Sequence, residues 1–351
     1  LTTFHFTTTS DSEVLLAAYQ KWGATMLSKL NGMFSIAIWD TEKRELFLAR
    51  DRFGVKPLYY SFCNGSLYFA SEIKSLFHAG VPKVMNQPVW AAYFKKGSYG
   101  MPNQSFWKGI EQLPGGNYAI LSLNDTTLQP QLWYDFVDRI KNTPKLPVTV
   151  LKESYEALLL DAIRLRFRAD VPVGMNISGG LDSSILLAMV NAHLPSHEKI
   201  DAFTFYSNDQ RYDELSWVED LVSNTGYHLN KVLFAPNAVP DLIQKVSYYQ
   251  DEPFGGFPTL AYSLLFEAAR KRNIPVLLDG QGMDEAWAGY DYYFTDSNFL
   301  IQGLTSNPVH PECIDPELLA QKQIEIYDKP FESQLQNLQY RDLLYTKIPR
   351  A

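Results

Sequence analysis

Small and hydroxyl-bearing residues follow a short apolar stretch in the middle of the chain. Residues 171–177 include β-branched side chains typical of a buried strand, and Ser178-Gly179-Gly180 is typical of a turn before an apolar, helix-like run. Glycines let the backbone approach a ligand closely, and the amides at a helix start carry partial positive charge. Further hydroxyl donors come from Ser178, Ser183 and Ser184. This strand, loop and helix predict a site for phosphate or pyrophosphate.

The same loop contains Asp182. A carboxylate beside phosphates is repelled unless a cation lies between them, so Asp182 implies a bridging Mg²⁺. The loop has neither the Gly-Lys-Ser/Thr ending nor the Gly-x-Gly-x-x-Gly spacing of the two commonest nucleotide-binding fingerprints. An ordinary strand-to-helix turn is the alternative interpretation.

The second half of the chain alternates predicted strands with predicted helices. Strands are predicted at 171–177, 201–206, 229–234 and 274–279, and helices at 151–168, 183–194, 213–224, 239–249 and 258–272. This alternation predicts an α/β domain with a parallel sheet covered on both faces, whose ligand binds at the carboxyl ends of the strands. A second loop at such an end, 279–285, has two glycines and the carboxylates of Asp284 and Glu285.

The first third of the chain is predicted to be mostly antiparallel sheet. A helix is predicted over 13–23, after the capping-type residues Ser10 and Asp11. Hairpins are predicted over 32–50, with a turn at 41–44, and over 57–70, with a turn at Asn64-Gly65. Residues 75–150 contain many prolines and glycines and are predicted as irregular connections.

Several motifs resemble those of one known family. Residues 178–184, Ser-Gly-Gly-Leu-Asp-Ser-Ser, resemble the pyrophosphate loop of the ATP-pyrophosphatase superfamily, whose members use ATP to adenylate a carboxylate or carbonyl oxygen. Residues 30–34, 49–60 and 69–74 resemble the later half of the glutamine amidohydrolase domain of glutamine-hydrolysing asparagine synthetases. Residues 279–285 resemble another motif of that family, and the resemblance covers essentially the whole chain. Charged residues in 49–60 could otherwise be a solvated turn with surface ion pairs, namely Asp51, Arg52 and Lys56.

The resemblance implies two domains. Residues 1–140 would be the later portion of a type 2 glutamine amidotransferase domain, an incomplete α+β fold with the antiparallel sheets of an N-terminal-nucleophile amidohydrolase. Residues 141–351 would be an α/β, Rossmann-like ATP-pyrophosphatase domain that is truncated at its C-terminal end. The Pro-containing stretch 136–149 is predicted as the linker.

The ends of the chain lead us to interpret it as a fragment. In the family, a Cys at residue one attacks glutamine with its own α-amino group as the base. Neither this Cys, nor the Asn-Gly of its oxyanion hole, nor a later catalytic lysine has a counterpart here, and Cys63 has no terminal amine. We therefore expect no glutaminase activity, and weak or absent adenylation, from these residues alone.

The resemblance also implies which residues form the sites. The expected ATP-binding residues are Ser178, Gly179, Gly180, Leu181, Asp182, Ser183, Ser184, Phe205, Asp279 and Gly280. For Phe205 the contact would be made by backbone polar groups at the adenine edge. Mg²⁺ would take oxygen ligands from Asp182 and Asp284 and bridge the pyrophosphate.

Three further residues are expected to contact substrates. Asp11 would pair with the α-ammonium of glutamine, and its alternative role is a helix N-cap. Asp251 and Glu252 match a family segment that lines the acyl-substrate site. They could instead cap or solvate a loop.

Gln281 departs from the commonest family pattern. Many of these synthetases have Glu at this position, which is linked to formation of the acyl-adenylate. Gln cannot be a general base, although it can hydrogen-bond substrate or nucleotide. Variants with Gln occur in the family, so we interpret Gln281 as a subgroup feature and assign no certain catalytic residue.

Composition limits the class of protein. The 351 residues are 46% hydrophobic, enough for about two domains. A net charge of −8 without a long basic run disfavours a nucleic-acid partner. Cys63 and Cys313 are too few for a disulfide framework or a metal site, which favours a reducing cytoplasm. The sequence has no apolar run of bilayer-spanning length, so no membrane partner is expected.

Together these features predict ATP-dependent asparagine synthesis by the intact parent protein. ATP would convert aspartate to a β-aspartyl-AMP intermediate, and ammonia from glutamine would attack its acyl carbon. The alternatives are a related carboxylate-adenylating enzyme, such as a β-lactam-type or natural-product synthetase, and a nucleotide-binding protein without catalysis. The expected partners are glutamine, aspartate and ATP, and a homodimer is left open.

Overall fold

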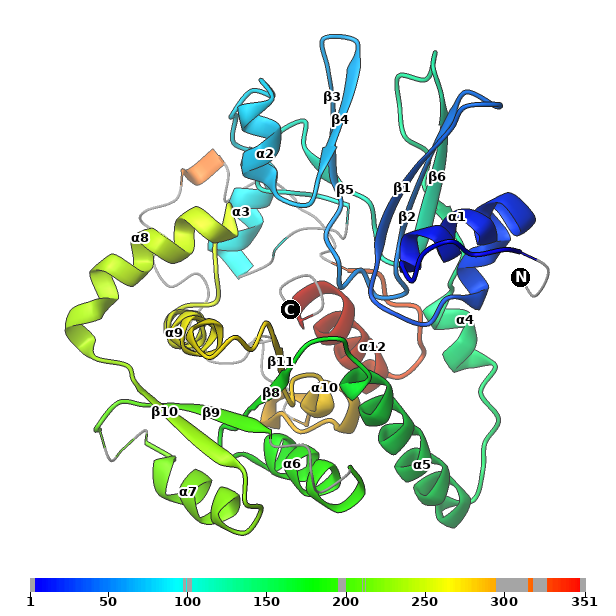
Figure 1. The fold of residues 1–351 in the computed structure, drawn as a ribbon. Coiled ribbons are helices and arrows are strands. Elements are labelled where there is room, and N and C mark those ends of the chain that lie inside the picture. Colours follow the sequence, from blue (N-terminus) through cyan, green and yellow to red (C-terminus); the bar gives the residue numbers. More distant parts are fainter. Residues whose placement is uncertain are drawn as a thin grey trace. The chain divides into compact units, whose positions relative to one another are not determined.

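The computed structural model contains two compact units (Figure 1). The structure describes residues 4–96, 99, 103–194, 200–209, 211, 213–294, 315–317 and 327–347. The first unit comprises Leu1–Thr143 and Ala288–Ala351, and the second comprises Pro144–Trp287. No helix within the described ranges is both long and apolar enough to cross a membrane.

Two antiparallel sheets form the framework of the first unit. One has the strand order β1-β2-β6-β7, made of Ser35–Asp40, Glu45–Arg50, Asn117–Ser122 and Gln131–Leu132. The other has the order β4-β3-β5, made of Ser66–Ala70, Tyr59–Cys63 and Glu111–Gln112. Both predicted hairpins are confirmed, and the positive φ angles of Asn64 and Gly65 suit a tight turn between β3 and β4.

Two consecutive helices cover the first of these sheets. They are α1, Asp11–Trp22, and the 3₁₀ helix η1, Gly23–Lys29. Ala18 of α1 is buried against Phe47 of β2. The amphipathic helix predicted for this segment is therefore confirmed, and its apolar face explains its position on the sheet.

The region 75–150 is more regular than its sequence predicts. It includes β5, β6 and β7 together with α2, Ile73–His78, α3, Gln87–Lys96, and α4, Phe136–Lys141. The prediction of irregular connections is wrong for the helices α3 and α4, whereas the pairing of Asn117 with Leu132 confirms a hairpin that the family resemblance implies at 113–117 and 132–134. Pro88 does not disrupt α3, because it lies in the first turn, where the missing N–H has no helical partner to lose.

The described C-terminal residues of the first unit enclose a buried acid. They form η3, Asp291–Tyr293, α12, Gln334–Arg341, and the π-helix η5, Asp342–Lys347. Asp342 is 3% exposed and accepts hydrogen bonds from the hydroxyls of Tyr292, at 2.7 Å, and Tyr293, at 2.8 Å. Arg341 lies 2.6 Å from the other carboxylate oxygen. The partners compensate for the loss of water around this charge.

Asp51 is a second buried carboxylate, just after β2. It is 2% exposed, and its oxygens accept hydrogen bonds at 3.0 to 3.2 Å from the backbone N–H groups of Phe34, Phe53, Val55 and Lys56. The interpretation of this segment as a solvated turn with surface ion pairs is wrong for Asp51. Its carboxylate instead organises the backbone of the turn that follows β2.

We predict that Asp51→Asn destabilises the first unit. An amide has one acceptor oxygen and would place an NH₂ donor against backbone N–H groups. Because each buried, unsatisfied polar group costs about 1–3 kcal/mol, we expect a loss of about 3 kcal/mol, measured by urea unfolding. Asp125→Asn is the control, because Asp125 is exposed and also accepts a backbone hydrogen bond, from Ser122 at 2.7 Å. Equal losses in the two variants would contradict the prediction.

The second unit is built on a parallel sheet with the strand order β10-β9-β8-β11. The strands are β8, Val173–Asn176, β9, Asp201–Tyr206, β10, His228–Leu233, and β11, Val276–Leu278. The helices are α5, Val148–Phe167, α6, Leu181–His193, α7, Leu215–Ser223, η2, Pro236–Ala238, α8, Val239–Gln250, α9, Phe257–Lys271, and α10, Met283–Trp287. Each predicted strand and helix is confirmed, with small differences at the ends.

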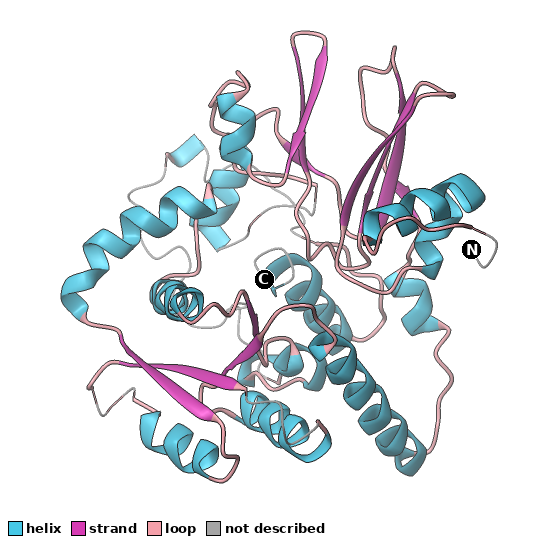
Figure 2. Cartoon of the chain, viewed as in Figure 1, coloured by secondary structure: helices cyan, strands magenta, loops and turns pink. Residues whose placement is uncertain are grey.

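Helices cover both faces of this sheet (Figure 2). Ala202 and Phe203 are adjacent on β9, so their side chains point to opposite faces. On one face Ala202 packs with Ile163 of α5 and Val218 of α7. On the other, Phe203 packs with Leu265 of α9. The predicted α/β class is confirmed, and the carboxyl ends of the strands are left to carry the loops of the site.

Candidate functional site

A loop of glycine and serine joins β8 to α6. Gly180 is the N-cap of α6, and no side chain in the described part of the chain caps this helix. Ser178 Oγ lies 3.1 Å from Ser183 Oγ and 3.3 Å from Gly180 N. Ser184 Oγ donates to the Gly180 carbonyl at 2.8 Å, and Gly179 has a φ of 84°, which glycine adopts readily. The predicted strand, loop and helix are all present, with the helix start directed at the loop.

The loop 279–285 packs directly on this first loop. A Cβ atom on Gly280 would lie 2.9 Å from Ser183 N and 3.0 Å from the carbonyl carbon of Asp182. Such distances are too short for a side chain, so Gly280 allows the two backbones to touch. Within the second loop, the Gln281 N–H donates to Asp279 Oδ1 at 3.1 Å. The structure therefore brings together residues that the sequence places about a hundred positions apart.

Carboxylates converge where the two loops meet. Burial raises the pKa of Asp182, and the negative charges of Asp284, Glu285 and Asp279 raise it further. A backbone hydrogen bond from Asp284 acts in the opposite direction. Asp182 is therefore within electrostatic reach of Asp284, the other predicted metal ligand.

The chemistry of this cluster suits Mg²⁺. This ion prefers oxygen ligands and is often held by one or two carboxylates together with substrate phosphates. In the part of the chain that the structure describes, no group of three or more His, Cys, Asp or Glu side chains is arranged to hold a metal ion. A cation at Asp182 and Asp284 would therefore need phosphate ligands as well, and it would relieve the repulsion between the two acids.

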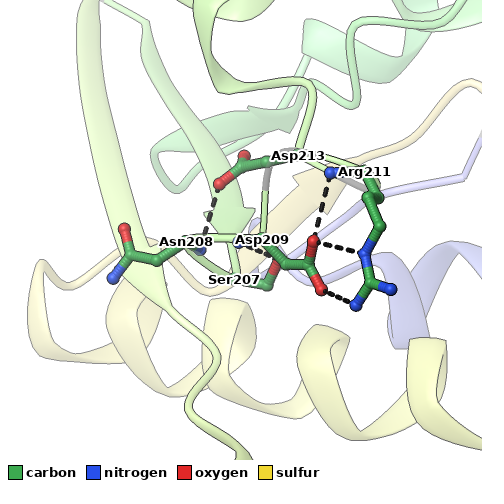
Figure 3. Close-up of polar contacts among 5 residues, drawn as sticks. All are labelled: Ser207, Asn208, Asp209, Arg211 and Asp213. Atoms are coloured by element: carbon green, nitrogen blue, oxygen red, sulfur yellow. Dashed lines mark hydrogen bonds and ion pairs between the residues drawn. The ribbon is translucent and has the colours of Figure 1, made fainter.

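A polar loop follows β9 at the same end of the sheet (Figure 3). Asp209 Oδ1 accepts from Arg211 Nε at 2.9 Å, and Asp209 Oδ2 lies 2.6 Å from Arg211 Nη2. These bonds hold the pKa of Asp209 below its usual value. The Asn208 N–H donates to Asp213 Oδ2 at 3.1 Å. We did not identify this loop from the sequence, although Asn208, whose φ is 61°, belongs to a residue type enriched in that conformation.

Phe205 lies near the end of β9. Its ring is half-buried, with its centroid 6.5 Å from that of Phe234 and 6.4 Å from that of Tyr262. The side chain therefore belongs to the packing of the sheet against α9. A contact between its backbone and adenine stays a prediction.

The predicted substrate residues lie outside the two loops. Asp11 is the exposed first residue of α1 in the first unit, and the N-cap of that helix is Ser10, which accepts from Ser12 N. Asp251 is the C-cap of α8, with a φ of 60°, and is followed by Glu252. Both residues of this pair are half-buried. The substrate roles of all three acids stay predictions.

Two residues beside the loops were missed by the sequence analysis. Asn176, the last residue of β8, donates from Nδ2 to Asp279 Oδ2 at 3.3 Å. Tyr262 of α9 has its pKa raised to about 12, first by burial and then by the charge of Asp279, while a hydrogen bond with Gln281 lowers it. The signal for Asn176 was an amide within the otherwise apolar stretch 171–177. The helical sequence around Tyr262 carried no comparable signal.

We predict that Asp284→Asn raises the unfolding temperature at pH 7. Burial and the charge of Asp284 raise the pKa of Asp182 above its unfolded value of 3.8. The ionised Asp182 therefore lowers the free energy of unfolding. This loss develops as the pH rises from the pKa of Asp182 in the unfolded chain to its higher pKa in the folded protein. Removing one charge from a partly exposed pair should return about 0.5 kcal/mol.

Thermal unfolding at pH 7 and near pH 3 tests this prediction. The gain should be present at the higher pH and absent below the unfolded pKa of Asp182, where Asp182 carries little charge. Asp220→Asn, an exposed acid on α7, is the control. A gain of equal size at both pH values would point to packing rather than charge.

Two families match the chain in sequence. The family described as "Glutamine amidotransferase domain" matches residues 2–134. The family described as "Asparagine synthase" matches residues 154–348, which is more than half of the chain.

Curated relatives resemble most of the chain. "Amidase chyE" of Penicillium rubens is 29% identical, over 93% of this chain and 49% of that protein. "Asparagine synthetase [glutamine-hydrolyzing] 1" of Bacillus subtilis is 28% identical, over 98% of this chain and 57% of that protein. The chain spans about half the length of the curated relatives it matches.

Solved structures are more distantly similar. A glutamine-dependent NAD+ synthetase from Acinetobacter baumannii, in complex with ADP, is 15% identical over 78% of this chain and 65% of that chain, with a TM-score of 0.30. The fold of this chain is defined by the pairing of its own strands.

Proposed function

The chain belongs to the asparagine synthase family, and we propose that it takes part in ATP-dependent amide formation on a carboxylate. In this reaction a carboxylate oxygen attacks the α-phosphorus of ATP, and pyrophosphate leaves. Ammonia derived from glutamine then attacks the acyl carbon, AMP leaves, and the nitrogen loses a proton. The proposal concerns the whole protein, to which the residues of this chain contribute the nucleotide loops.

The contact between the two loops is the observation that supports this proposal best. Gly280 rests on the backbone of Asp182 and Ser183, at the carboxyl end of a parallel sheet. An isolated glycine loop is commonly a simple turn, but two such loops in contact form one continuous surface. That surface combines helix-start amides, hydroxyls and acids, which is the combination that a metal-bound triphosphate requires.

We assign the phosphates of ATP to residues 178–184 and 279–280, and the adenine edge to the backbone of Phe205. Asp182 and Asp284 would hold Mg²⁺, which when bound would neutralise phosphate charge and favour departure of pyrophosphate. Gln281 would hydrogen-bond the acyl group or the attacking nucleophile, because its amide can donate and accept.

Aspartate is our first candidate for the acyl substrate, with Asp251 and Glu252 near its pocket. A β-aspartyl-AMP intermediate would follow. The second candidate is the carboxylate of a natural product, which is favoured by the similarity to an amidase and by Gln281 in the second loop.

The first unit would supply the ammonia. The match of residues 2–134 to a glutamine amidotransferase domain supports this role. Asp11 is exposed and would pair with the α-ammonium of glutamine. We further propose that the functional division of the chain lies near residue 140, with amidotransferase residues at 1–140 and synthetase residues at 141–351.

We predict that Gly180→Val weakens ATP binding without unfolding the protein. Gly180 has a φ of −71°, which any residue tolerates, and among described atoms its added Cβ would approach only Ser178 Oγ, at 3.4 Å. A valine side chain would instead occupy the space where phosphates approach the helix start. We expect Kd for Mg-ATP to rise by about tenfold or more, equal to about 1.4 kcal/mol, in calorimetry.

The control is Gly32→Val, a glycine of the first unit with no described atom within 4 Å of an added Cβ. Both variants should keep the free energy of unfolding within about 0.5 kcal/mol of the parent chain. Unchanged ATP binding in Gly180→Val would contradict the assignment of the ATP phosphates to residues 178–184.

Exchange of labelled pyrophosphate into ATP tests the proposed reaction directly. With the whole protein we expect exchange that depends on a carboxylate and on Mg²⁺, and aspartate should be the best of a panel of amino-acid and natural-product carboxylates. Exchange with another carboxylate alone would select the second candidate. ATP binding without exchange by any carboxylate would contradict the proposed enzymatic function.

A further inference from the structure

Asn176 is a polar residue buried at the end of β8. It is 6% exposed, between Met175 and Ile177, which are 0% and 2% exposed. Its Nδ2 donates to Asp279 Oδ2 at 3.3 Å, whereas its Oδ1 accepts no hydrogen bond from any residue that the structure describes. A buried carbonyl oxygen without a donor destabilises the folded state. An apolar residue would suit this position better, so the amide needs another reason.

The stability of the fold does not supply that reason. Asp279, the partner of Asn176, is an exposed acid, and water would satisfy its carboxylate if the amide were absent. The hydrogen bond therefore adds little to folding, and its effect is geometric. It fixes the direction of the Asp279 side chain relative to β8, the strand that leads into the loop 178–184.

The other oxygen of Asp279 carries this constraint into the second loop. Asp279 Oδ1 accepts the Gln281 N–H at 3.1 Å. The intervening Gly280 lies against the backbone of Asp182 and Ser183. Asn176, Asp279 and Gln281 thus form a chain of hydrogen bonds that joins the end of β8 to the second loop and ends at Gln281, where the sequence departs from the commonest family pattern.

We propose that Asn176 is a positioning residue, which through Asp279 fixes the backbone of Gln281 and so the point from which the Gln281 side chain extends. The link itself is a property of the fold. Its effect on the reaction rests on the proposed function, because only an adenylating enzyme would use Gln281 in this way.

Hydrogen exchange of the full chain, measured by mass spectrometry on peptides spanning 279–285, tests the link. In Asn176→Leu the Gln281 amide should exchange about fivefold to tenfold faster, as expected when a net hydrogen bond is lost. The unfolding temperature should stay the same or rise, because the buried oxygen is removed. A merely structural asparagine would instead show a lower unfolding temperature.

Asn230→Leu is the matched control. Asn230 lies on β10 and donates to Asp201 Oδ1 at 2.9 Å, so it makes the same type of bond near the amino ends of the strands. It should leave exchange in 279–285 unchanged. Asp279→Ala changes an exposed residue and should raise hydrogen exchange in 279–285 as Asn176→Leu does. The variant with both substitutions should exchange no faster than either single variant.

Several outcomes would overturn the proposal. One is a Gln281 amide that exchanges at the parent rate in Asn176→Leu. The others are an equal rise of that rate in Asn230→Leu, and additive rises in the variant with both Asn176→Leu and Asp279→Ala. Where the link holds, Asn176→Leu should lower kcat for pyrophosphate exchange by about tenfold and leave KM for ATP unchanged, as expected for a lost alignment. A whole protein with no pyrophosphate exchange would contradict the proposed function alone, since the hydrogen-exchange result would still decide the link.

Discussion

The backbone of the second loop can rest on the start of α6 only because residue 280 has no side chain. A Cβ there would overlap main-chain atoms of Asp182 and Ser183, and main-chain atoms cannot rotate away as a flexible side chain can. Every other property of the site depends on this contact. It brings the acids within electrostatic reach of one another, and it sets Gln281 beside the loop that begins the helix.

The chain holds buried or half-buried acids in two different ways. Asp51 and Asp342 have their charges matched by donors, backbone N–H groups in one case and hydroxyls with a guanidinium in the other. Such groups are satisfied and stabilise the fold. Asp182 is different, because its neighbours are other acids and its pKa rises. Neighbouring acids that repel one another are typical of a site that binds a charged ligand.

The order of strands and helices in the second unit could be predicted because its apolar runs alternate with helical periodicity and each end has a turn signal. The two loops could be predicted because glycines, serines and acids gather at the ends of β8 and β11. The bond from Asn176 to Asp279 could not, since it joins residues 103 positions apart and leaves no periodic trace. The burial of Asp51 could not be predicted for a related reason. Its charged neighbours are typical of a surface turn, and its hydrogen bond from the Phe34 N–H joins residues 17 positions apart. Pro88 favoured an irregular segment where α3 forms. Proline is tolerated in the first turn of a helix, so its position matters more than its residue type.

The N-cap of α6 is Gly180, which has no side chain to cap the helix. Ser178 lies before this position and Ser183 after it, and their hydroxyls contact each other. A side chain at the N-cap can complete this end, as it does in α1, α4 and α12, whereas Gly180 has none to offer. Here the missing partner would be the ligand, so capping the helix and holding a phosphate become the same set of hydrogen bonds. In the proposed reaction, pyrophosphate would leave with phosphate oxygens that ATP had placed at this helix start. Its release would therefore require the first turn of α6 to give up its cap, so product departure, rather than nucleotide entry, would be the step that opposes local folding.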